Sequence, residues 1–171
     1  KTSMKNLLNK IRAKNVNILI IGLGYLGLPL LKNISKKGFN VFGLDNNKNL
    51  IINLKKKLKK NFFFDNYDKI DFNKIDVIIL ALPTPVNNKK KPNLSYIKNC
   101  INSIFPKLSE NKLIILESTS YPTTTEELIV SKFNKKFTIG KNFFIGYSPE
   151  REDPGNKNFN IKNIPKIVSG K

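Results

Sequence analysis

The amino-acid sequence predicts an α/β fold, a mainly parallel sheet with helices on both faces. Short runs of branched apolar residues alternate along the chain with segments whose apolar residues recur at helical spacing. The apolar runs are continuous, as in parallel strands that are buried on both faces. The run at 18–21 leads into Gly22, Gly24 and Gly27, the G-x-G-x-x-G spacing that follows the first strand of a Rossmann-type, doubly wound fold.

The N-terminal residues predict a short amphipathic helix at 3–14. Leu7, Leu8 and Ile11 form its apolar stripe, and Ser3 is a possible N-cap. We expect residues 1–14 to be a helical appendage and residues 15–171 to form one domain.

Two strand–helix units follow the appendage. The first has a strand at 16–23 and a crossover helix at 26–37, which ends at Gly38 as the C′ residue. The second has a strand at 41–44 and a helix at 47–60 with apolar residues inward and lysines outward. This alternation is typical of a parallel sheet.

The middle of the chain predicts two more strands and one helix. Residues 61–65 form a short aromatic strand, and the turn-like residues 66–74 leave no room for a full helix. The buried strand at 76–82 is stopped by prolines. The helix at 94–108 carries Pro106 near its end, which favours an early break.

The last part predicts strands at 113–116 and 143–147 and a helix at 123–133 between them, and a further strand begins at Lys166. Two threonine–glutamate pairs with capping-box spacing open this helix: Thr123 with Glu126, and Thr124 with Glu127.

The glycine spacing predicts a dinucleotide site. Gly22 permits a tight turn, Gly24 lets the backbone approach a pyrophosphate, and Gly27 lets the following helix pack closely. That helix directs N–H groups and its positive dipole end at the diphosphate. Asp45, about 20 residues beyond the second glycine, can accept both hydroxyls of an adenosine ribose. Its charge repels a 2′-phosphate, and Lys48 is the cation nearby, so we expect NAD and not NADP.

The composition limits the other function classes. The net charge of +19 comes from lysines scattered among asparagines, and arginine occurs only at Arg12 and Arg151, so we expect a solvated basic surface and no nucleic-acid partner. No apolar run approaches the ~20 residues of a membrane span, and no signal peptide is recognisable, so no membrane partner is expected. The single cysteine fits a reducing compartment, and we predict a cytoplasmic protein without a metal site.

Five motifs occur in a fixed order: GLGYLGLPL, LPTP, NLSYI, ESTSYPTTTEEL, and YSPEREDPGN followed by NIPKIVSG. In this series the chain resembles the NAD-binding N-terminal domain of the UDP-glucose/GDP-mannose dehydrogenase family, most of all bacterial members that act on UDP-N-acetylhexosamines. The resemblance implies oxidation of a sugar C6 alcohol through a thiohemiacetal to a carboxylate with two NAD⁺, in surface polysaccharide biosynthesis. It also implies a UDP-sugar substrate and, for the full-length enzyme, a homodimer or higher homo-oligomer.

The resemblance also implies roles for individual residues. It places Thr84 along the nicotinamide half, Thr119 on a catalytic water, Glu150 as the general base for thioester hydrolysis, and Arg151 at the substrate. Each has a simpler reading: a strand terminator at 83–85, loop polarity at Thr119, an exposed turn carboxylate and a surface arginine. The predicted cofactor-binding residues are Gly22, Leu23, Gly24, Tyr25, Leu26, Gly27, Asp45, Lys48, Pro83, Thr84 and Thr119.

The chain departs from the family pattern in three ways. It stops before the family's central helix and C-terminal substrate domain, so we expect it to be inactive alone. About one helix is missing between Lys60 and Asn61, and Asn93 replaces a frequent aspartate. Cys100 does not replace the family's nucleophilic cysteine, because we expect it on the inward face of the helix at 94–108, with Tyr96, buried and remote from the strand ends. The alternatives are a truncated, non-catalytic NAD-binding module, and a UDP-glucose or GDP-mannose dehydrogenase of the same family.

Overall fold

The computed structural model describes residues 2–58, 62–86, 92–149 and 166–170. Within them the chain forms one seven-stranded sheet of order β3-β2-β1-β4-β5-β6-β7. Neighbouring strands pair in parallel, except that β7 pairs antiparallel with β6. The strands are β1 Asn17–Ile21, β2 Asn40–Leu44, β3 Phe62–Phe64, β4 Val77–Leu80, β5 Lys112–Leu116, β6 Phe143–Tyr147 and β7 Ser169–Gly170. The predicted α/β fold is confirmed.

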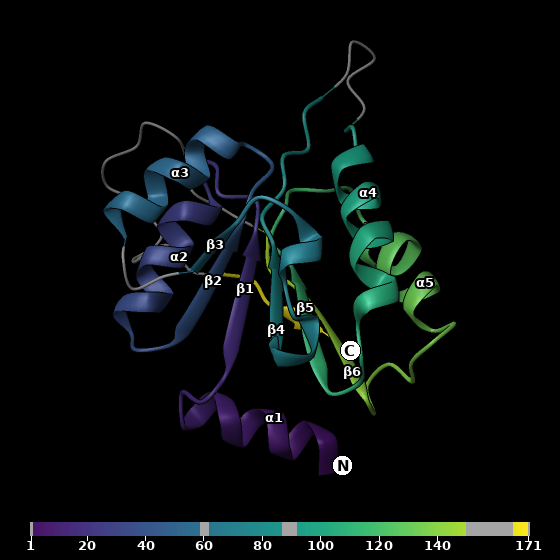
Figure 1. Ribbon diagram of the computed structural model, residues 1–171. Coiled ribbons are helices and arrows are strands. Elements are labelled where there is room, and N and C mark those ends of the chain that lie inside the picture. The colour runs from purple at the N-terminus through teal and green to yellow at the C-terminus, as the bar shows by residue number, and fades with distance from the viewer. Residues whose placement is uncertain (1, 59–61, 87–91, 150–165, 171) are drawn as a thin grey trace.

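Helices cover both faces of this sheet, as Figure 1 shows, with α2 and α3 on one face and α4 and α5 on the other. The helices are α1 Thr2–Arg12, α2 Gly27–Lys36, α3 Lys48–Lys57, α4 Ser95–Ile104 and α5 Ser131–Phe133. Strand β1 explains the two layers. Its Leu19 and Ile21 belong to the core under α4, whereas Ile18 and Ile20 belong to the core under α2 and α3. A strand buried on both faces requires the continuous apolar run that the sequence shows.

The connection from β3 to β4 consists of two single 3₁₀ turns, η1 Tyr67–Lys69 and η2 Phe72–Lys74. The Asn66 side chain accepts a hydrogen bond from the Asp68 N–H, and the Asp71 side chain accepts one from the Asn73 N–H. These local caps fix each turn as a separate unit, so the predicted absence of a full helix here is confirmed.

The helix predicted at 123–133 is confirmed for residues 124–133, but it is irregular and its predicted capping boxes are wrong. A π-helical segment, Glu126–Val130, precedes the short α5. Thr123 has a positive φ of 74° and donates its hydroxyl to Glu127 Oε1 at 2.6 Å, and the Thr124 hydroxyl donates to the Tyr121 carbonyl at 2.7 Å. Because both hydroxyls are engaged in these contacts, neither capping box forms. The break predicted at Pro106 is confirmed, since α4 ends at Ile104 and a 3₁₀ turn follows.

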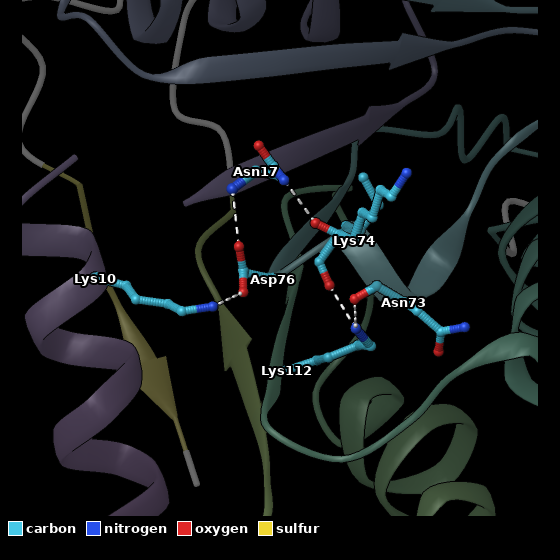
Figure 2. A network of polar contacts seen from close by, with 7 residues as sticks. Lys10, Asn17, Asn73, Lys74, Asp76 and Lys112 are labelled. Atoms are coloured by element: carbon cyan, nitrogen blue, oxygen red, sulfur yellow. Dashed lines mark hydrogen bonds and ion pairs between the residues drawn. The ribbon is translucent and has the colours of Figure 1, made fainter. Parts of the chain in front are cut away.

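Helix α1 lies across the amino edge of the sheet, at the bottom of Figure 1. The Asp76 carboxylate joins it to the strands, because Oδ1 accepts from Lys10 Nζ at 2.8 Å and Oδ2 accepts from the Asn17 N–H at 2.9 Å (Figure 2). In the same network Lys112, only 3% exposed, donates from Nζ to the Ile75 carbonyl at 2.5 Å. That residues 1–14 are an appendage to a domain of residues 15–171 stays a prediction.

No helix in the described part of the chain has the length and apolar character needed to cross a membrane.

Candidate functional site

A cleft of about 850 Å³ lies at the carboxyl edge of the sheet, where loops after β1, β2, β3, β4 and β5 meet one face of α4. We call it the carboxyl-edge cleft. Its volume is in the range of small-molecule and cofactor sites, and the carboxyl edge is where open α/β sheets bind ligands. Among the predicted site residues it brings together Gly22, Gly24, Tyr25, Leu26, Asp45, Pro83, Thr84 and Thr119.

The three glycines after β1 differ in the space around them. A Cβ on Gly22, whose φ is +92°, would lie 2.4 Å from the Ala81 carbonyl oxygen. A Cβ on Gly27 would lie 1.7 Å from the Gly22 oxygen, so the turn and the packing predicted for these two glycines are confirmed. A Cβ on Gly24 would meet nothing within 4 Å, so the floor of the cleft is open at this residue.

The start of α2 adds an anion-binding element to this floor. Leu26 is the N-cap and makes no side-chain capping hydrogen bond, and the first turn contains Pro29, which has no N–H. Tyr25 and Leu26 both line the cleft. An uncapped helix start of this kind directs backbone N–H groups and a positive dipole end at a ligand.

Asp45 stands at the end of β2 with its carboxylate held by the backbone. Oδ2 accepts from the Leu23 N–H at 2.8 Å, and Oδ1 accepts from the Asn47 N–H at 2.9 Å. Each carboxylate oxygen keeps a second acceptor position for a ligand. Leu23 thus orients Asp45 through its backbone, while its own side chain is 1% exposed in the core. Lys48 is exposed at the start of α3 and does not line the cleft.

The other end of the cleft is formed by the loops after β4 and β5. Pro83 and Thr84 line it from the first loop and Thr119 from the second. The buried Ser118 joins the two loops, because its Oγ accepts from the Leu82 N–H at 2.9 Å and donates to the Leu80 carbonyl at 3.3 Å. Sequence reasoning missed this serine, although a hydroxyl directly after a buried strand was the available signal.

A salt bridge joins Glu117 and Lys166. Glu117, at the end of β5, is 6% exposed, and its Oε2 lies 2.5 Å from Lys166 Nζ. This contact ties β5 to the segment that leads into β7. Glu150 and Arg151, the predicted base and substrate residues, lie outside the described residues.

Sequence reasoning missed one wall of the cleft. The wall combines Tyr67 from η1 with residues of α4 at i, i+3, i+4 and i+7 spacing: Tyr96, Asn99, Cys100 and Ser103. The prediction that Tyr96 points inward is wrong, since this side chain is 47% exposed. Cys100 is buried as predicted, at 2% exposure, but its predicted distance from the strand ends is wrong because it lines this wall.

Burial raises the pKa of the Cys100 thiol to about 12, partly offset by a hydrogen bond from the Tyr67 hydroxyl. Burial, together with the nearby Cys100 sulfur, likewise raises the pKa of Tyr67 above its ordinary value. Both groups are therefore protonated at neutral pH, which excludes Cys100 as a thiolate nucleophile there.

These features fit a dinucleotide. The open floor at Gly24 and the uncapped start of α2 suit a diphosphate, and the Asp45 carboxylate suits a ribose diol. Among the described residues, no cluster of histidine, cysteine and carboxylate side chains could hold a metal ion.

Comparison with known proteins shows to which family the chain belongs. Residues 52–171 match the UDP-glucose/GDP-mannose dehydrogenase family, NAD binding domain. Protein CapL of Staphylococcus aureus is 36% identical over 169 residues, covering 91% of this chain and 40% of CapL. The UDP-N-acetyl-D-glucosamine 6-dehydrogenase of Pseudomonas aeruginosa is 33% identical over 171 residues, covering 92% of this chain and 40% of that enzyme.

A solved structure agrees with the sequence matches. The crystal structure of an NDP-N-acetyl-D-galactosaminuronic acid dehydrogenase from Methanosarcina mazei Go1 has a TM-score of 0.81 at 25% identity, covering 98% of this chain and 41% of that one. This chain spans about 40% of the length of the curated relatives it matches. The resemblance and the cofactor predicted from the motifs are confirmed. The chain belongs to the UDP-glucose/GDP-mannose dehydrogenase family, of which it matches the NAD-binding domain, and the cofactor of this domain is NAD.

Proposed function

We propose that this chain is the cofactor-binding part of a nucleotide-sugar 6-dehydrogenase that oxidises the C6 alcohol of a UDP-N-acetylhexosamine to a uronate, for surface polysaccharide biosynthesis. The observation that carries the proposal is one continuous cleft, which runs from the open floor at Gly24 and the carboxylate of Asp45 to Thr84 and Thr119. The relative named UDP-N-acetyl-D-glucosamine 6-dehydrogenase supports the choice of substrate.

In this proposal the cofactor, when bound, accepts hydride from the sugar. The floor at Gly22 and Gly24 and the start of α2 hold the diphosphate, and Asp45 holds the adenosine ribose. Pro83 and Thr84 lie along the nicotinamide half. Thr119 positions the water that hydrolyses the thioester, and the Ser118 bridge fixes the two loops that carry Thr84 and Thr119.

The remaining predicted residues enter through the SPEREDPGN motif. Glu150 is the proposed general base, because a chain without histidine needs a carboxylate for this proton transfer. Arg151 is the proposed substrate contact, since a guanidinium can bind a carboxylate or phosphate through two hydrogen bonds. Leu23, Tyr25, Leu26, Gly27 and Lys48 complete the proposed cofactor-binding set.

The cellular setting is also a proposal. The unpaired, buried Cys100 supports a reducing compartment, and we place the enzyme in the cytoplasm. The family resemblance supports a homodimer or a higher homo-oligomer for the longer protein, which a native mass measurement would show.

The test is an NADH production assay on the purified 171-residue chain and on the longer protein of its source gene, each with UDP-N-acetylglucosamine, UDP-N-acetylgalactosamine and UDP-glucose. We expect two NADH per N-acetylhexosamine from the longer protein and none from the chain alone, because holding the sugar in near-attack geometry needs groups outside this domain. A preference for UDP-glucose would favour the alternative substrate of the same family. A source gene that ends at this chain, with NAD binding and no turnover, would favour a non-catalytic module.

A further inference from the structure

Helix α1, which lies across the amino edge of the sheet (Figure 1), presents an amphipathic outer face. Met4 and Leu8 are 44% and 43% exposed, although both are large apolar side chains. Together with Arg12 they recur every four residues along one stripe of the helix, and the exposed Lys5 lies beside this stripe. The outer face of α1 therefore combines apolar side chains with cations.

The end of α2 continues this positive charge. Because β1 and β2 pair in parallel, α2 runs back from the carboxyl edge and ends at the amino edge, where Lys36 and Lys37 are exposed. Lys14, which follows α1, bridges the two helices, since its Cδ lies 3.7 Å from the position of a Cβ built on Gly38. We call this surface the basic edge, and it consists of Met4, Lys5, Leu8, Arg12, Lys14, Lys36 and Lys37.

The charge of the basic edge is not neutralised by neighbouring carboxylates. Asp45, at the cleft on the opposite edge, is the only acidic residue among residues 2–58. In the described part of the chain, none of the five cations of the basic edge forms an ion pair. The acidic residues that precede β4 and β5 at this edge have other partners: Asp71 with Lys74, Asp76 with Lys10, and Glu110 with Asn142. An anionic partner would therefore meet unopposed positive charge.

The inner face of α1 fixes the helix in this orientation. Leu7 is 6% exposed and belongs to the core under α2 and α3. Lys10 Nζ donates to Asp76 Oδ1 at 2.8 Å (Figure 2), and the Ser3 hydroxyl donates to the side chain of Asn111. Since the inner face is engaged in these contacts, Met4 and Leu8 stay on the outside of the folded chain.

An anionic lipid surface fits the basic edge better than other acidic partners do. A helix that lies in the plane of a bilayer surface buries its apolar side chains among the headgroups while lysine and arginine contact anionic lipids. Nucleic acid is disfavoured, because none of the seven residues is aromatic and could stack on a base. A second copy of the chain, bound face to face through α1, would place the cations of both copies against one another.

We propose that the basic edge binds the surface of a membrane that contains anionic lipids, with α1 in the headgroup plane and the carboxyl-edge cleft facing the water. The proposal revises the expectation that the chain has no membrane partner. No helix of the described residues could span a bilayer, but a peripheral contact does not require one. The inference does not depend on the proposed sugar substrate.

The test is co-sedimentation of the purified chain with large unilamellar vesicles, composed of phosphatidylcholine alone or with about one-third phosphatidylglycerol. Binding should require phosphatidylglycerol. The apparent affinity should fall at least about tenfold between about 0.1 M and about 0.5 M salt, because the added ions screen the lysines and the headgroups from one another. Equal binding to both kinds of vesicle, or binding to neither, would overturn the proposal.

Two charge variants test the place of binding. Lys5→Gln/Arg12→Gln should weaken binding to the phosphatidylglycerol vesicles about tenfold or more. Lys55→Gln/Lys98→Gln is the matched control, since it also removes two exposed cations, on α3 and in the first turn of α4, both of which Figure 1 shows apart from α1. The control should bind within about twofold of the unaltered chain. Equal weakening in both variants would show that the net charge acts without a defined surface, and would contradict the proposal.

A third variant separates a lipid surface from other polyanions. Met4→Gln/Leu8→Gln keeps every charge and should keep the urea midpoint, because both side chains are exposed. It should bind the phosphatidylglycerol vesicles about tenfold more weakly but elute from immobilised heparin with the unaltered chain, since heparin offers no apolar layer. Unchanged vesicle binding by this variant would overturn the role of α1. NADH should bind within about twofold with and without vesicles, and a loss of NADH affinity on the vesicles would contradict the proposed orientation of the cleft.

Discussion

At the scale of single residues, the tasks of Gly22, Gly24 and Gly27 depend on whether a Cβ would fit at each position. Gly22 and Gly27 are each within 2.4 Å of backbone oxygen at their missing Cβ, so their task is to let the chain fold. A Cβ on Gly24 would have free space around it, so the task of this glycine is to leave room for a ligand. Spacing alone assigns these tasks, because the G-x-G-x-x-G geometry is local to one strand–turn–helix unit.

This difference separates folding from binding in two variants. The free energy of unfolding of Gly24→Ala should lie within about 1 kcal/mol of that of the unaltered chain. This variant should bind NADH at least about tenfold more weakly, because the added methyl occupies the diphosphate position. Gly27→Ala should lose about 3 kcal/mol or more of unfolding free energy, because the methyl overlaps the Gly22 oxygen. Urea denaturation and NADH titration measure the two effects. Equal loss of stability in both variants would contradict the assignment.

Asp45 sets the choice between the two nicotinamide dinucleotides. Its carboxylate is oriented by the N–H groups of Leu23 and Asn47, so a 2′-phosphate would face a fixed negative charge. We expect NADH to bind more tightly than NADPH by a few kcal/mol, and Asp45→Asn to narrow that gap. Asp71→Asn, at the start of η2, is the control and should preserve it. Equal dissociation constants for the two cofactors in a fluorescence titration would refute this role.

At the scale of elements, helix α4 contributes more to the site than its sequence suggests. Its apolar stripe of Ile97, Ile101 and Ile104 was evident from the helical period and is buried. The sequence did not reveal that another face of α4, with Asn99 and Ser103, lines the cleft, because this depends on how α4 packs against the sheet. In the helical segment at 124–133 only the predicted capping boxes are wrong: the threonine hydroxyls bind other local acceptors, and capping-box spacing alone does not reveal that competition.

The element contacts at the amino edge predict a pH dependence of stability. Burial lowers the pKa of Lys112 below its ordinary 10.5, and the nearby Asp76 only partly offsets this. Between the lowered pKa and 10.5 the unfolded chain binds more protons at this lysine than the folded chain does. Stability from Lys112 therefore rises with pH through that window.

The comparison that isolates this effect uses Lys112→Met, which keeps a long apolar side chain but does not titrate. Urea midpoints are measured for both proteins at pH 8 and pH 10. All other titratable groups, including Cys100, are present in both proteins, so the difference between the two midpoints reports on Lys112. The unaltered chain should gain stability relative to Lys112→Met as the pH rises. A difference that stays constant would show that the folded and unfolded chains bind protons equally at Lys112. A difference that moves in the opposite direction would show that the folded chain binds more protons there, and either result would contradict the prediction.

At the scale of the whole molecule, the fold and the cofactor follow from the sequence far more completely than the site does. Strands β1, β4 and β6 are continuous apolar runs, and alternation with helices determines a parallel sheet whatever the details of the loops. The cleft, by contrast, depends on residues from the end of β1 to the loop after β5 that meet only in the folded chain, among them Tyr67 and Asn99. The net charge of +19 gives no direct guide to this cleft, whose described ionisable groups include the carboxylates of Asp45 and Asp65.

The central claim is that NAD binds at the carboxyl edge of this sheet. Backbone amide spectra of the ¹⁵N-labelled chain, recorded during titration with NADH, test both the binding and its place. We predict saturable shifts at Gly24, Asp45 and Thr119 and unchanged signals at Asp76 and Lys112 on the opposite edge. Shifts that concentrate at the amino edge, or spectra that do not change as NADH is added, would contradict the claim.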